Sequence, residues 1–155
     1  MPATIESRLA KLGITLPQAP SPAANYVPYV VSGPLVFLSG QVPMADGKPS
    51  FVGKVGADFS VDEGYQAARL CAVNLLAQLR NACDGDLDRV ERVVKLSGFV
   101  NCAPDFTAQP QVVNGASDLM VEVFGDAGRH ARFAVGAPAL PLGVAVEVDG
   151  VFELR

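Results

Sequence analysis

The sequence lacks tryptophan, contains a single histidine and has only three cysteines among its 155 residues. Cys71, Cys83 and Cys102 are odd in number and widely spaced, with no CxxC pair and no zinc-ligand spacing. We therefore expect unpaired, mostly buried thiols in a reducing compartment, no metal and no cofactor. No apolar run approaches the roughly 18 residues of a membrane helix, and the first residues are polar and charged, unlike a signal peptide. These absences predict a cytoplasmic protein.

Positive charge is also scarce. No block of lysines or arginines occurs, and the formal net charge is −4. A protein that binds nucleic acid normally presents a basic surface, because neutralising phosphates supplies most of its affinity. With no tryptophan and only three tyrosines, a platform for stacked bases is not expected either. We therefore expect no nucleic-acid partner.

Common catalytic motifs are missing as well. The sequence has no phosphate-binding GxxxxGK[ST] or GxGxxG loop and no GxSxG nucleophile elbow. His130 is the only candidate base for a serine–histidine–aspartate triad, and its place just before a strand is typical of a loop-end residue. Nucleotide binding and triad hydrolysis are therefore not indicated.

Apolar side chains, in contrast, are abundant. Half of the residues are hydrophobic, only 18% are charged, and the mean hydropathy is +0.29. Charged residues make up about a quarter of an average globular domain. A domain of this size cannot hide so much apolar surface alone, so we expect another subunit to cover part of it.

Residue periodicity predicts a single α+β domain over residues 23–155, preceded by a helix and an extended arm over residues 1–22. Apolar residues at helical spacing favour helices over 4–12, 60–85 and 110–125. Ser60 and Glu63 form an S-x-x-E capping box at the start of the second helix. Strands are expected in a hairpin about Gly33-Pro34 and over 50–56, 92–102, 131–137 and 144–154. This order predicts a mixed sheet with two long helices on one face.

The last two predicted strands raise the question of what Arg132 does in an otherwise apolar stretch. Alternation places it on one face with Ala134 and Gly136, and we expect the bulkier opposite face to pack under the helices. If the two strands pair antiparallel, with residue 137 opposite residue 144, Arg132 lies opposite Asp149. Two interpretations stay open: a structural salt bridge to Asp149, or binding of an anionic ligand.

Two motifs resemble one known family. The pattern R-x-x-V-x-x-x-x-L-P-x-x-x-x-V-E-V, from Arg132 to Val148, resembles the C-terminal signature of the RidA/YjgF family, also called endoribonuclease L-PSP. The stretch YVPYVVSGPLVFLSGQVPMADGK, residues 26–48, resembles its N-terminal block. The similarity spans roughly residues 23–155. It implies a chorismate-mutase-like α+β fold that assembles as a homotrimer, with ligand clefts between subunits.

The resemblance also implies a site. In family members that act as enamine/imine deaminases, an arginine matching Arg132 holds the carboxylate of a 2-imino acid, and a glutamate matches Glu147. Its other positions correspond to Tyr26, Ser39 and Asn114, the last of these expected before the second long helix. A carboxylate can orient a water for attack on the imine carbon, and arginine binds a carboxylate through a planar fork.

The chain departs from the deaminase pattern beside Arg132. Phe133 and Ala134 stand where deaminases carry serine or threonine and then cysteine, which indicates a divergent subgroup. The first hypothesis is therefore an enzyme that hydrolyses 2-imino acids to 2-keto acids and ammonia. The alternative is a trimeric binder of small carboxylate metabolites without turnover. An endoribonuclease is disfavoured by the acidic charge and the lack of a histidine pair.

Overall fold

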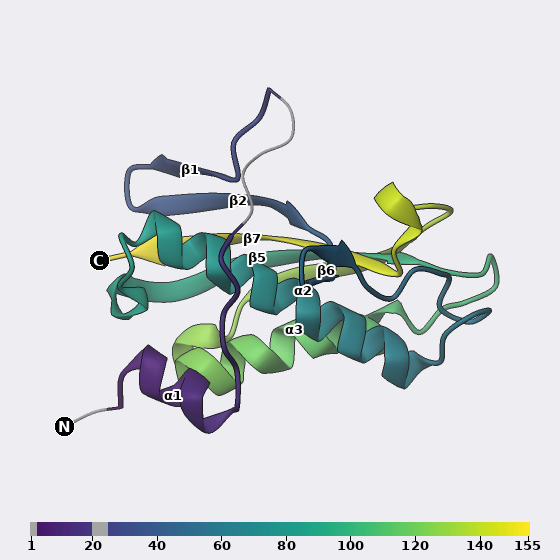
Figure 1. Cartoon of the computed structure of the whole chain (residues 1–155), viewed down its shortest axis with the longest axis horizontal. Helices are drawn as coiled ribbons and strands as arrows, with labels where there is room; N and C mark the ends of the chain where they lie inside the picture. Colours follow the sequence, from purple (N-terminus) through teal and green to yellow (C-terminus); the bar gives the residue numbers. More distant parts are fainter. Residues whose placement is uncertain (1–2, 20–24) are drawn as a thin grey trace.

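The computed structural model describes residues 3–19 and 25–155 and contains a five-stranded mixed sheet (Figure 1). Its strands lie in the order β1 (Tyr29–Ser32), β2 (Leu35–Gln41), β7 (Val146–Leu154), β5 (Val90–Asn101) and β6 (Ala131–Ala137). Strand β6 is parallel to β5, and the other neighbours are antiparallel. A small hairpin is formed by β3 (Met44–Ala45) and β4 (Lys48–Pro49). The predicted α+β class and mixed sheet are confirmed.

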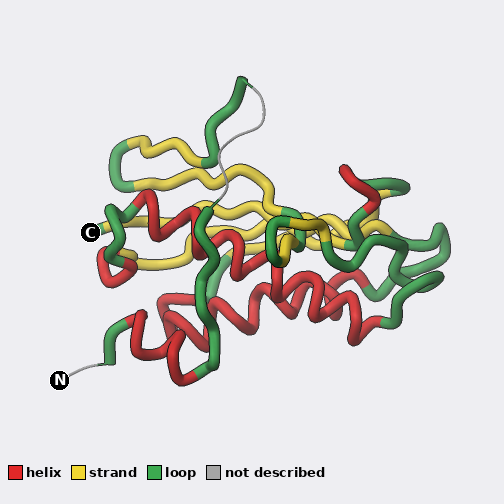
Figure 2. The backbone as a smooth tube through the Cα atoms, viewed as in Figure 1, coloured by secondary structure: helices red, strands yellow, loops and turns green. Residues whose placement is uncertain are grey.

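Two long helices, α2 (Val61–Ala82) and α3 (Gln109–Phe124), cover one face of this sheet (Figure 2). The predicted capping box starts α2: the Glu63 amide donates to Ser60 Oγ at 3.2 Å, and the Ser60 amide donates to Glu63 Oε1 at 3.0 Å. The helices cross closely at Gly115, where an added Cβ would lie 2.0 Å from the Tyr65 carbonyl oxygen. Among the described residues, none of the α-helices lies over the other face of the sheet (Figure 2).

Two sequence predictions about strands are wrong. Residues 50–56 form no strand and make only isolated bridges at Val52 and Val55. Positive φ angles at Phe51 (53°) and Gly53 (146°) interrupt the extended backbone there. The last two strands do not pair with each other, because β5 lies between them. The connection between them contains Pro138 and Pro141 and carries the chain across β5 instead of forming a hairpin.

The N-terminal helix α1 (Ile5–Lys11) docks against the end of α3. Ile5 and Leu9 are buried in the common core, and Arg8 Nη1 donates to the Val123 carbonyl oxygen at 3.0 Å. The Ile5 amide donates to Asp88 Oδ1 at 2.8 Å. Of the predicted arm, residues 15–19 are extended without regular structure, and residues 20–22 lie outside the described residues.

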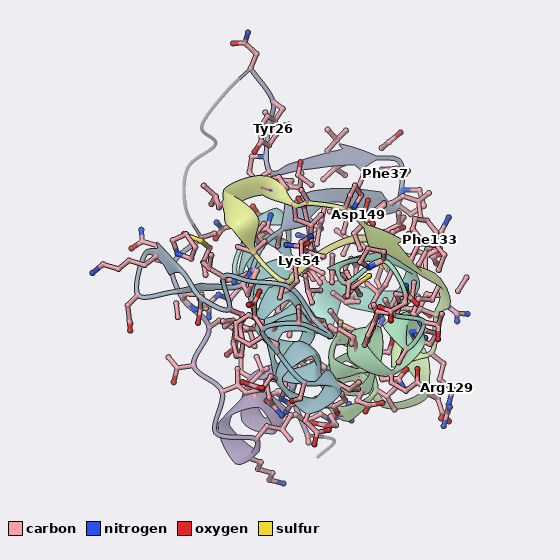
Figure 3. All side chains as sticks on the ribbon, turned by 90° about the vertical axis from the view of Figure 1, so that its right-hand side faces the viewer. Tyr26, Phe37, Lys54, Arg129, Phe133 and Asp149 are labelled. Carbon is pink, nitrogen blue, oxygen red and sulfur yellow. The ribbon has the colours of Figure 1, made fainter. Side chains whose placement is uncertain are left out.

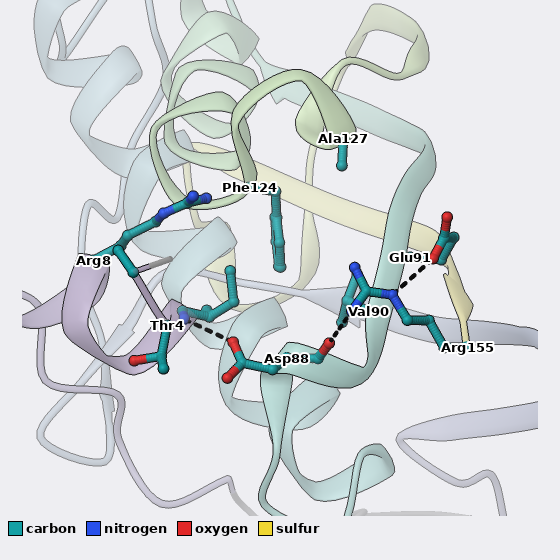
Figure 4. A pocket seen from close by; sticks show the side chains of 10 residues that line it. Thr4, Arg8, Asp88, Val90, Glu91, Phe124, Ala127 and Arg155 are labelled. Atoms are coloured by element: carbon teal, nitrogen blue, oxygen red, sulfur yellow. Dashed lines mark hydrogen bonds and ion pairs between the residues drawn. The ribbon is translucent and has the colours of Figure 1, made fainter. Parts of the chain in front are cut away.

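A pocket of about 400 Å³ lies between α1 and the rest of the domain (Figure 4). Its polar groups bind one another: Arg155 Nε pairs with Glu91 Oε2 at 2.8 Å, and Arg155 Nη1 donates to the Asp88 carbonyl oxygen at 3.2 Å. These contacts join the C-terminal residue and the 3₁₀ turn Leu87–Arg89 beside the docked helix. The pocket is therefore part of how α1 is attached.

The buried side of α1 gives a direct stability prediction. Leu9 is 2% exposed, whereas Leu12, just past the helix end, is 37% exposed. We expect Leu9→Ala to lower the free energy of unfolding by about 2–4 kcal/mol and Leu12→Ala to lower it by less than about 1 kcal/mol, because only the first leaves a cavity. Urea denaturation of both variants measures this difference. Equal effects would show that α1 does not contribute to the cooperative core.

Within residues 3–19 and 25–155, no helix is both long and apolar enough to cross a membrane. The three cysteines are buried and form no disulfide, as predicted.

Candidate functional site

Arg132 lies on edge strand β6, on the face of the sheet that the helices cover. Its register partner on β5 is the buried Leu96, whereas Phe133 and Val135 are 38% and 41% exposed on the opposite face. The prediction that the bulky residues of this strand pack under the helices is therefore wrong. Ala134 and Gly136 follow Arg132 on the helix-covered face. Gly136 allows close packing, because an added Cβ would lie 3.0 Å from Cys102 Sγ.

Neutral oxygen atoms hold the guanidinium of Arg132 in place. Nη1 donates to Asn114 Oδ1 at 2.8 Å and to Ser117 Oγ at 3.1 Å, and Nη2 lies 3.5 Å from the Pro110 carbonyl oxygen. None of the ion pairs among the described residues includes Arg132. Its positive charge therefore remains uncompensated within that part of the chain.

The salt bridge to Asp149 that the sequence left open is wrong. Asp149 pairs in register with Ser97, which in turn pairs with Phe133, so these three side chains lie on the open face. Arg132 lies on the other face. The structure therefore excludes the first of the two interpretations.

The guanidinium keeps the donors that binding of an anion needs. Asn114 and Ser117 occupy the two N–H groups of Nη1, while Nε has no protein acceptor in residues 3–19 and 25–155. The Nε–H and one N–H of Nη2 lie side by side and form the fork that accepts a carboxylate bidentately. Asn114 and Ser117 thus orient Arg132 through Nη1, and the N–H groups of Nε and Nη2 are available for a carboxylate.

His130 and Ser117 extend this network. His130 Nδ1 lies 2.6 Å from the Gly128 carbonyl oxygen, and its Nε2 lies 2.9 Å from Ser117 Oγ. Burial lowers the pKa of His130; the bond to Gly128 opposes this shift and the charge of Arg132 adds to it. The imidazole is therefore neutral at pH 7, its Nδ1–H donates to Gly128, and its Nε2 accepts from the Ser117 hydroxyl. We call Asn114, Ser117, His130 and Arg132 the arginine cluster.

Sequence reasoning identified only part of the arginine cluster. Asn114 lies within α3, inside the predicted helix over 110–125, and not before the helix as the family resemblance implied. Ser117 was missed, although its position three residues after Asn114 places both on one side of the helix. His130 was interpreted as a loop-end residue with no role in the site. A shallow pocket of about 310 Å³ adjoins the cluster and is also lined by Asp118, Val121 and Arg129.

Glu147 lies on the open face of the sheet, on β7. Burial raises the pKa of its carboxyl group, and Asp149 on the same face raises it further. Its Oε1 occupies the space beside Gly40, where an added Cβ would be 2.6 Å away. In this structure, Gly40 therefore allows the observed position of the Glu147 carboxylate.

Ser39 directly precedes Gly40 on β2 and contacts the segment that carries Tyr26. Ser39 Oγ donates to the Val27 carbonyl oxygen at 2.7 Å and so fastens the segment that carries Tyr26 to β2. Tyr26 itself is exposed, at one extremity of the molecule (Figure 3). We call Tyr26, Ser39 and Glu147, which the family resemblance assigns to one site, the glutamate cluster.

One chain does not bring the two clusters together on one face. Arg132 is in register with Leu96 and Gly150 on the helix-covered face, whereas Glu147 is in register with Phe99, next to Val135, on the open face. The structure thus joins Arg132 to Asn114, with Ala134 following on the same face, but separates them from Glu147. A single substrate cannot contact both Arg132 and Glu147 of the same chain in this arrangement.

The open face carries exposed apolar side chains around Glu147. Phe99 and Phe133 pack edge to face, with ring centroids 5.6 Å apart, and Lys95 Nζ lies 5.3 Å from the Phe133 centroid. Phe37 on β2 and Val135 on β6 are also exposed on this face (Figure 3). Several large apolar side chains exposed on one face of a sheet are typical of an interface.

Among the described residues, no three histidine, cysteine, aspartate or glutamate side chains are grouped to hold a metal ion. The chemistry of the site therefore has to be argued from arginine, asparagine, serine and carboxylate groups. The fold and the site thus define a small α+β domain with an arginine at the edge of its sheet that pairs with no carboxylate of the described residues.

The family follows from comparison with known proteins. Residues 6–154 match the family described as "YjgF/chorismate_mutase-like, putative endoribonuclease", and the chain belongs to this family. The match begins within α1, ahead of the region that the motifs indicated. The resemblance stated from the sequence is confirmed.

Three relatives cover nearly the whole chain. Protein TCP17 of Trypanosoma cruzi is 53% identical over 152 residues, which are 97% of this chain and 94% of that protein. The crystal structure of Atu1372 from Agrobacterium tumefaciens, a protein of unknown function, is 50% identical with a TM-score of 0.92, covering 97% and 92% of the two chains. A Shewanella oneidensis structure with an endoribonuclease description similar to that of the family is 41% identical, with a TM-score of 0.94, covering 98% and 100%.

Proposed function

We propose that this protein hydrolyses 2-imino acids to 2-keto acids and ammonia, at sites shared between the chains of a homotrimer. The observation that carries the proposal is the guanidinium of Arg132, which is oriented by Asn114 and Ser117 and has no carboxylate partner among the described residues. Its remaining N–H fork fits the carboxylate of a 2-imino acid.

Glu147 supplies the second requirement, a base for water. Its carboxylate accepts a proton from the water as the oxygen attacks the imine carbon, giving a tetrahedral carbinolamine. This proton and then that of the new hydroxyl group pass to the nitrogen, the carbon–nitrogen bond breaks as the carbonyl group forms, and the products are the keto acid and ammonia. The imine is reactive, so holding its carboxylate and one water in place supplies much of the rate.

The separation of the two clusters supports the trimer. Arg132 and Glu147 lie on opposite faces of the sheet, so one substrate can contact both only if they come from different chains. The exposed apolar side chains around Glu147 provide a surface for that association. We therefore assign the arginine cluster to one chain of each site and the glutamate cluster to its neighbour.

Ala134 and Phe133 limit the chemical groups that the site can use. Ala134 brings no thiol next to Arg132, so the proposed reaction uses no proton transfer at this position. Phe133 lies on the open face, in the surface that we assign to the interface. This loss of the cysteine favours a second candidate, a trimer that binds small carboxylates without turning them over.

Ammonia release from freshly generated 2-iminopropanoate separates the two functions, with a known imine deaminase as positive control. Release well above the rate in buffer, together with pyruvate formation, supports hydrolysis. Pyruvate binding without any acceleration of ammonia release would establish the binding protein instead. Failure of both would contradict the carboxylate site itself.

The pH dependence of turnover tests the role of Glu147. Only the ionised carboxylate accepts a proton, so activity should fall as the pH drops through its raised pKa. Asp149→Asn removes the smaller of the two causes of that shift, and we expect the acid limb of the kcat profile to move to lower pH. Burial, the larger cause, remains, so the limb should stay above the ordinary value of 4.5.

Glu153→Gln is the matched control, because it removes a carboxylate from the same face of β7 further from Glu147. Its acid limb should coincide with that of the unmodified protein. An Asp149→Asn limb that moves to higher pH, or does not move, would remove Glu147 from the proton transfer.

A further inference from the structure

A further cavity, of about 520 Å³, opens at the end of the sheet where β5 and β6 finish, on the side of the molecule that faces the viewer in Figure 3. Its volume is within the range of small-molecule sites. None of the side chains of the arginine or glutamate clusters lines it. Its lining residues are Lys54, Cys102, Ala103, Pro104, Phe106, Gln109, Gly136, Ala137 and Pro138.

Lys54 is the only charged residue in that lining, and its ammonium group is held by neutral oxygens. Nζ donates to Asn101 Oδ1 at 2.7 Å and to the Pro138 carbonyl oxygen. The carboxylate of Asp58 accepts from the backbone amide of Lys54 instead, at 2.8 Å. No ion pair of the described residues includes Lys54. Of its three N–H donors, one remains for a ligand.

Asn101 fixes the position of this ammonium group. It is 4% exposed, and its Nδ2 donates to the Val144 carbonyl oxygen at 3.1 Å, with the Gly53 carbonyl oxygen 3.4 Å away. These bonds direct Oδ1 toward Lys54. A surface lysine normally extends its charge into water. Here a buried asparagine and a carbonyl hold the charge at a cavity wall, an arrangement that is preorganised for an anion.

The rest of the lining is mostly apolar. Phe106, two prolines and two alanines supply hydrocarbon, and Gly136 has no side chain to fill the space. The donor end of Gln109 is used within the protein, because its Nε2 donates to the Phe106 carbonyl oxygen at 2.9 Å and to Cys102 Sγ at 3.7 Å. One positive charge in an apolar cavity matches one negative charge on an apolar body. It matches a phosphate dianion poorly, because that group needs more donors than the cavity offers.

We propose that this cavity is a second binding site, separate from Arg132, for a monocarboxylate with a small aliphatic or aromatic body. Lys54 binds the carboxylate, the apolar lining covers the body, and Asn101 is a positioning residue for Lys54. The site does not depend on imine hydrolysis, so either proposal can fail alone.

Phenylacetate is a suitable probe, with phenylacetamide as its uncharged counterpart. We expect calorimetry to show saturable binding of phenylacetate at millimolar concentration and none of the amide. Lys54→Met removes the charge and keeps the length of the side chain, and it should weaken binding by at least about tenfold, the loss of one charge-assisted hydrogen bond. Lys48→Met, on the exposed hairpin strand β4, is the matched control and should bind like the unmodified protein. Arg132→Met should also bind normally.

Cys102 provides a readout that needs no variant. It is 8% exposed and lines the cavity, whereas Cys71 and Cys83 are fully buried in the core. Phenylacetate should therefore slow alkylation of Cys102 by N-ethylmaleimide, measured by peptide mass analysis, and phenylacetamide should not.

Several results would overturn the proposal. The cavity is not the proposed site if phenylacetate does not bind or if phenylacetamide binds equally well. The same holds if inorganic phosphate competes with phenylacetate at similar concentration. Binding that Arg132→Met removes and Lys54→Met leaves intact would place phenylacetate in the site proposed for hydrolysis. Alkylation of Cys102 at the same rate with and without phenylacetate would show that the cavity stays empty.

Discussion

Replacing Arg132 with methionine should abolish recognition of small 2-keto acids while leaving the fold intact. Two charge-assisted hydrogen bonds to the ligand carboxylate are lost, each contributing about 1.5 kcal/mol or more, so pyruvate binding should weaken by about a hundredfold or more. Ammonia release from 2-iminopropanoate should fall at least as far. Arg132→Lys should recover only part of the binding, because one ammonium cannot reproduce the fork of Nε and Nη2.

The melting temperature is the second measurement on these variants. The guanidinium contacts only neutral oxygens of Asn114, Ser117 and Pro110, so its removal leaves no unpaired charge behind. We expect a loss of no more than about 1 kcal/mol. Arg129→Met is the control, because that side chain lines the same shallow pocket but pairs with Asp126 at 3.5 Å. An Arg132→Met protein that melts far lower and still binds pyruvate would reduce Arg132 to a structural residue.

The local elements of this fold could be predicted because their signals are local. The capping box of Ser60 and Glu63 marks the start of α2, and apolar residues at helical spacing mark its buried side. The failure at residues 50–56 has an equally local cause. Phe51 adopts a left-handed φ of 53°, which its residue type does not suggest, so an apparently regular strand is broken.

The partner and face of β6 could not be predicted in the same way. Alternation shows that Arg132, Ala134 and Gly136 share a face, but it does not show which face the helices cover. Here the small residues lie under α3 and the aromatic residue points away, the reverse of the usual pattern for a lone domain. That reversal is itself informative, since Phe133 on an open face agrees with an interface to another chain.

The candidate site could likewise be predicted from the sequence only in part. The family motif indicated Arg132 and Glu147 by their spacing, and the resemblance matched Asn114 by its place relative to the second long helix. The structure places Asn114 Oδ1 2.8 Å from Arg132 Nη1. Ser117 and His130 carry no motif, because their contact joins α3 to the residue before β6. The family resemblance also assigns Arg132 and Glu147 to one site. Only the sheet register shows that the two side chains of one chain lie on opposite faces.

Two variants that are inactive alone should therefore regain activity when they are mixed. Arg132→Met destroys the arginine cluster and leaves the glutamate cluster intact, and Glu147→Gln does the reverse. In a closed trimer each site takes one cluster from each of two neighbouring chains. Every mixed trimer then contains one site of three with both clusters intact, so about one third of the sites should be restored in a sample that contains only mixed trimers. Ammonia release from co-expressed, differently tagged chains, purified through both tags, measures this recovery, once light scattering shows particles of about three times 16.2 kDa.

A mixture of Arg132→Met with Asn114→Asp is the control, because both changes fall in the arginine cluster and no pairing of chains makes a complete site. Its activity should not exceed that of Asn114→Asp alone. Sites contained within one chain predict no recovery in either mixture, since every chain then carries a defect in its own site. If verified mixed trimers do not recover activity, Arg132 and Glu147 do not act in the same site. A stable monomer of 16.2 kDa would rule out the shared site at once, because the register of β6 and β7 keeps the two side chains apart within a single chain.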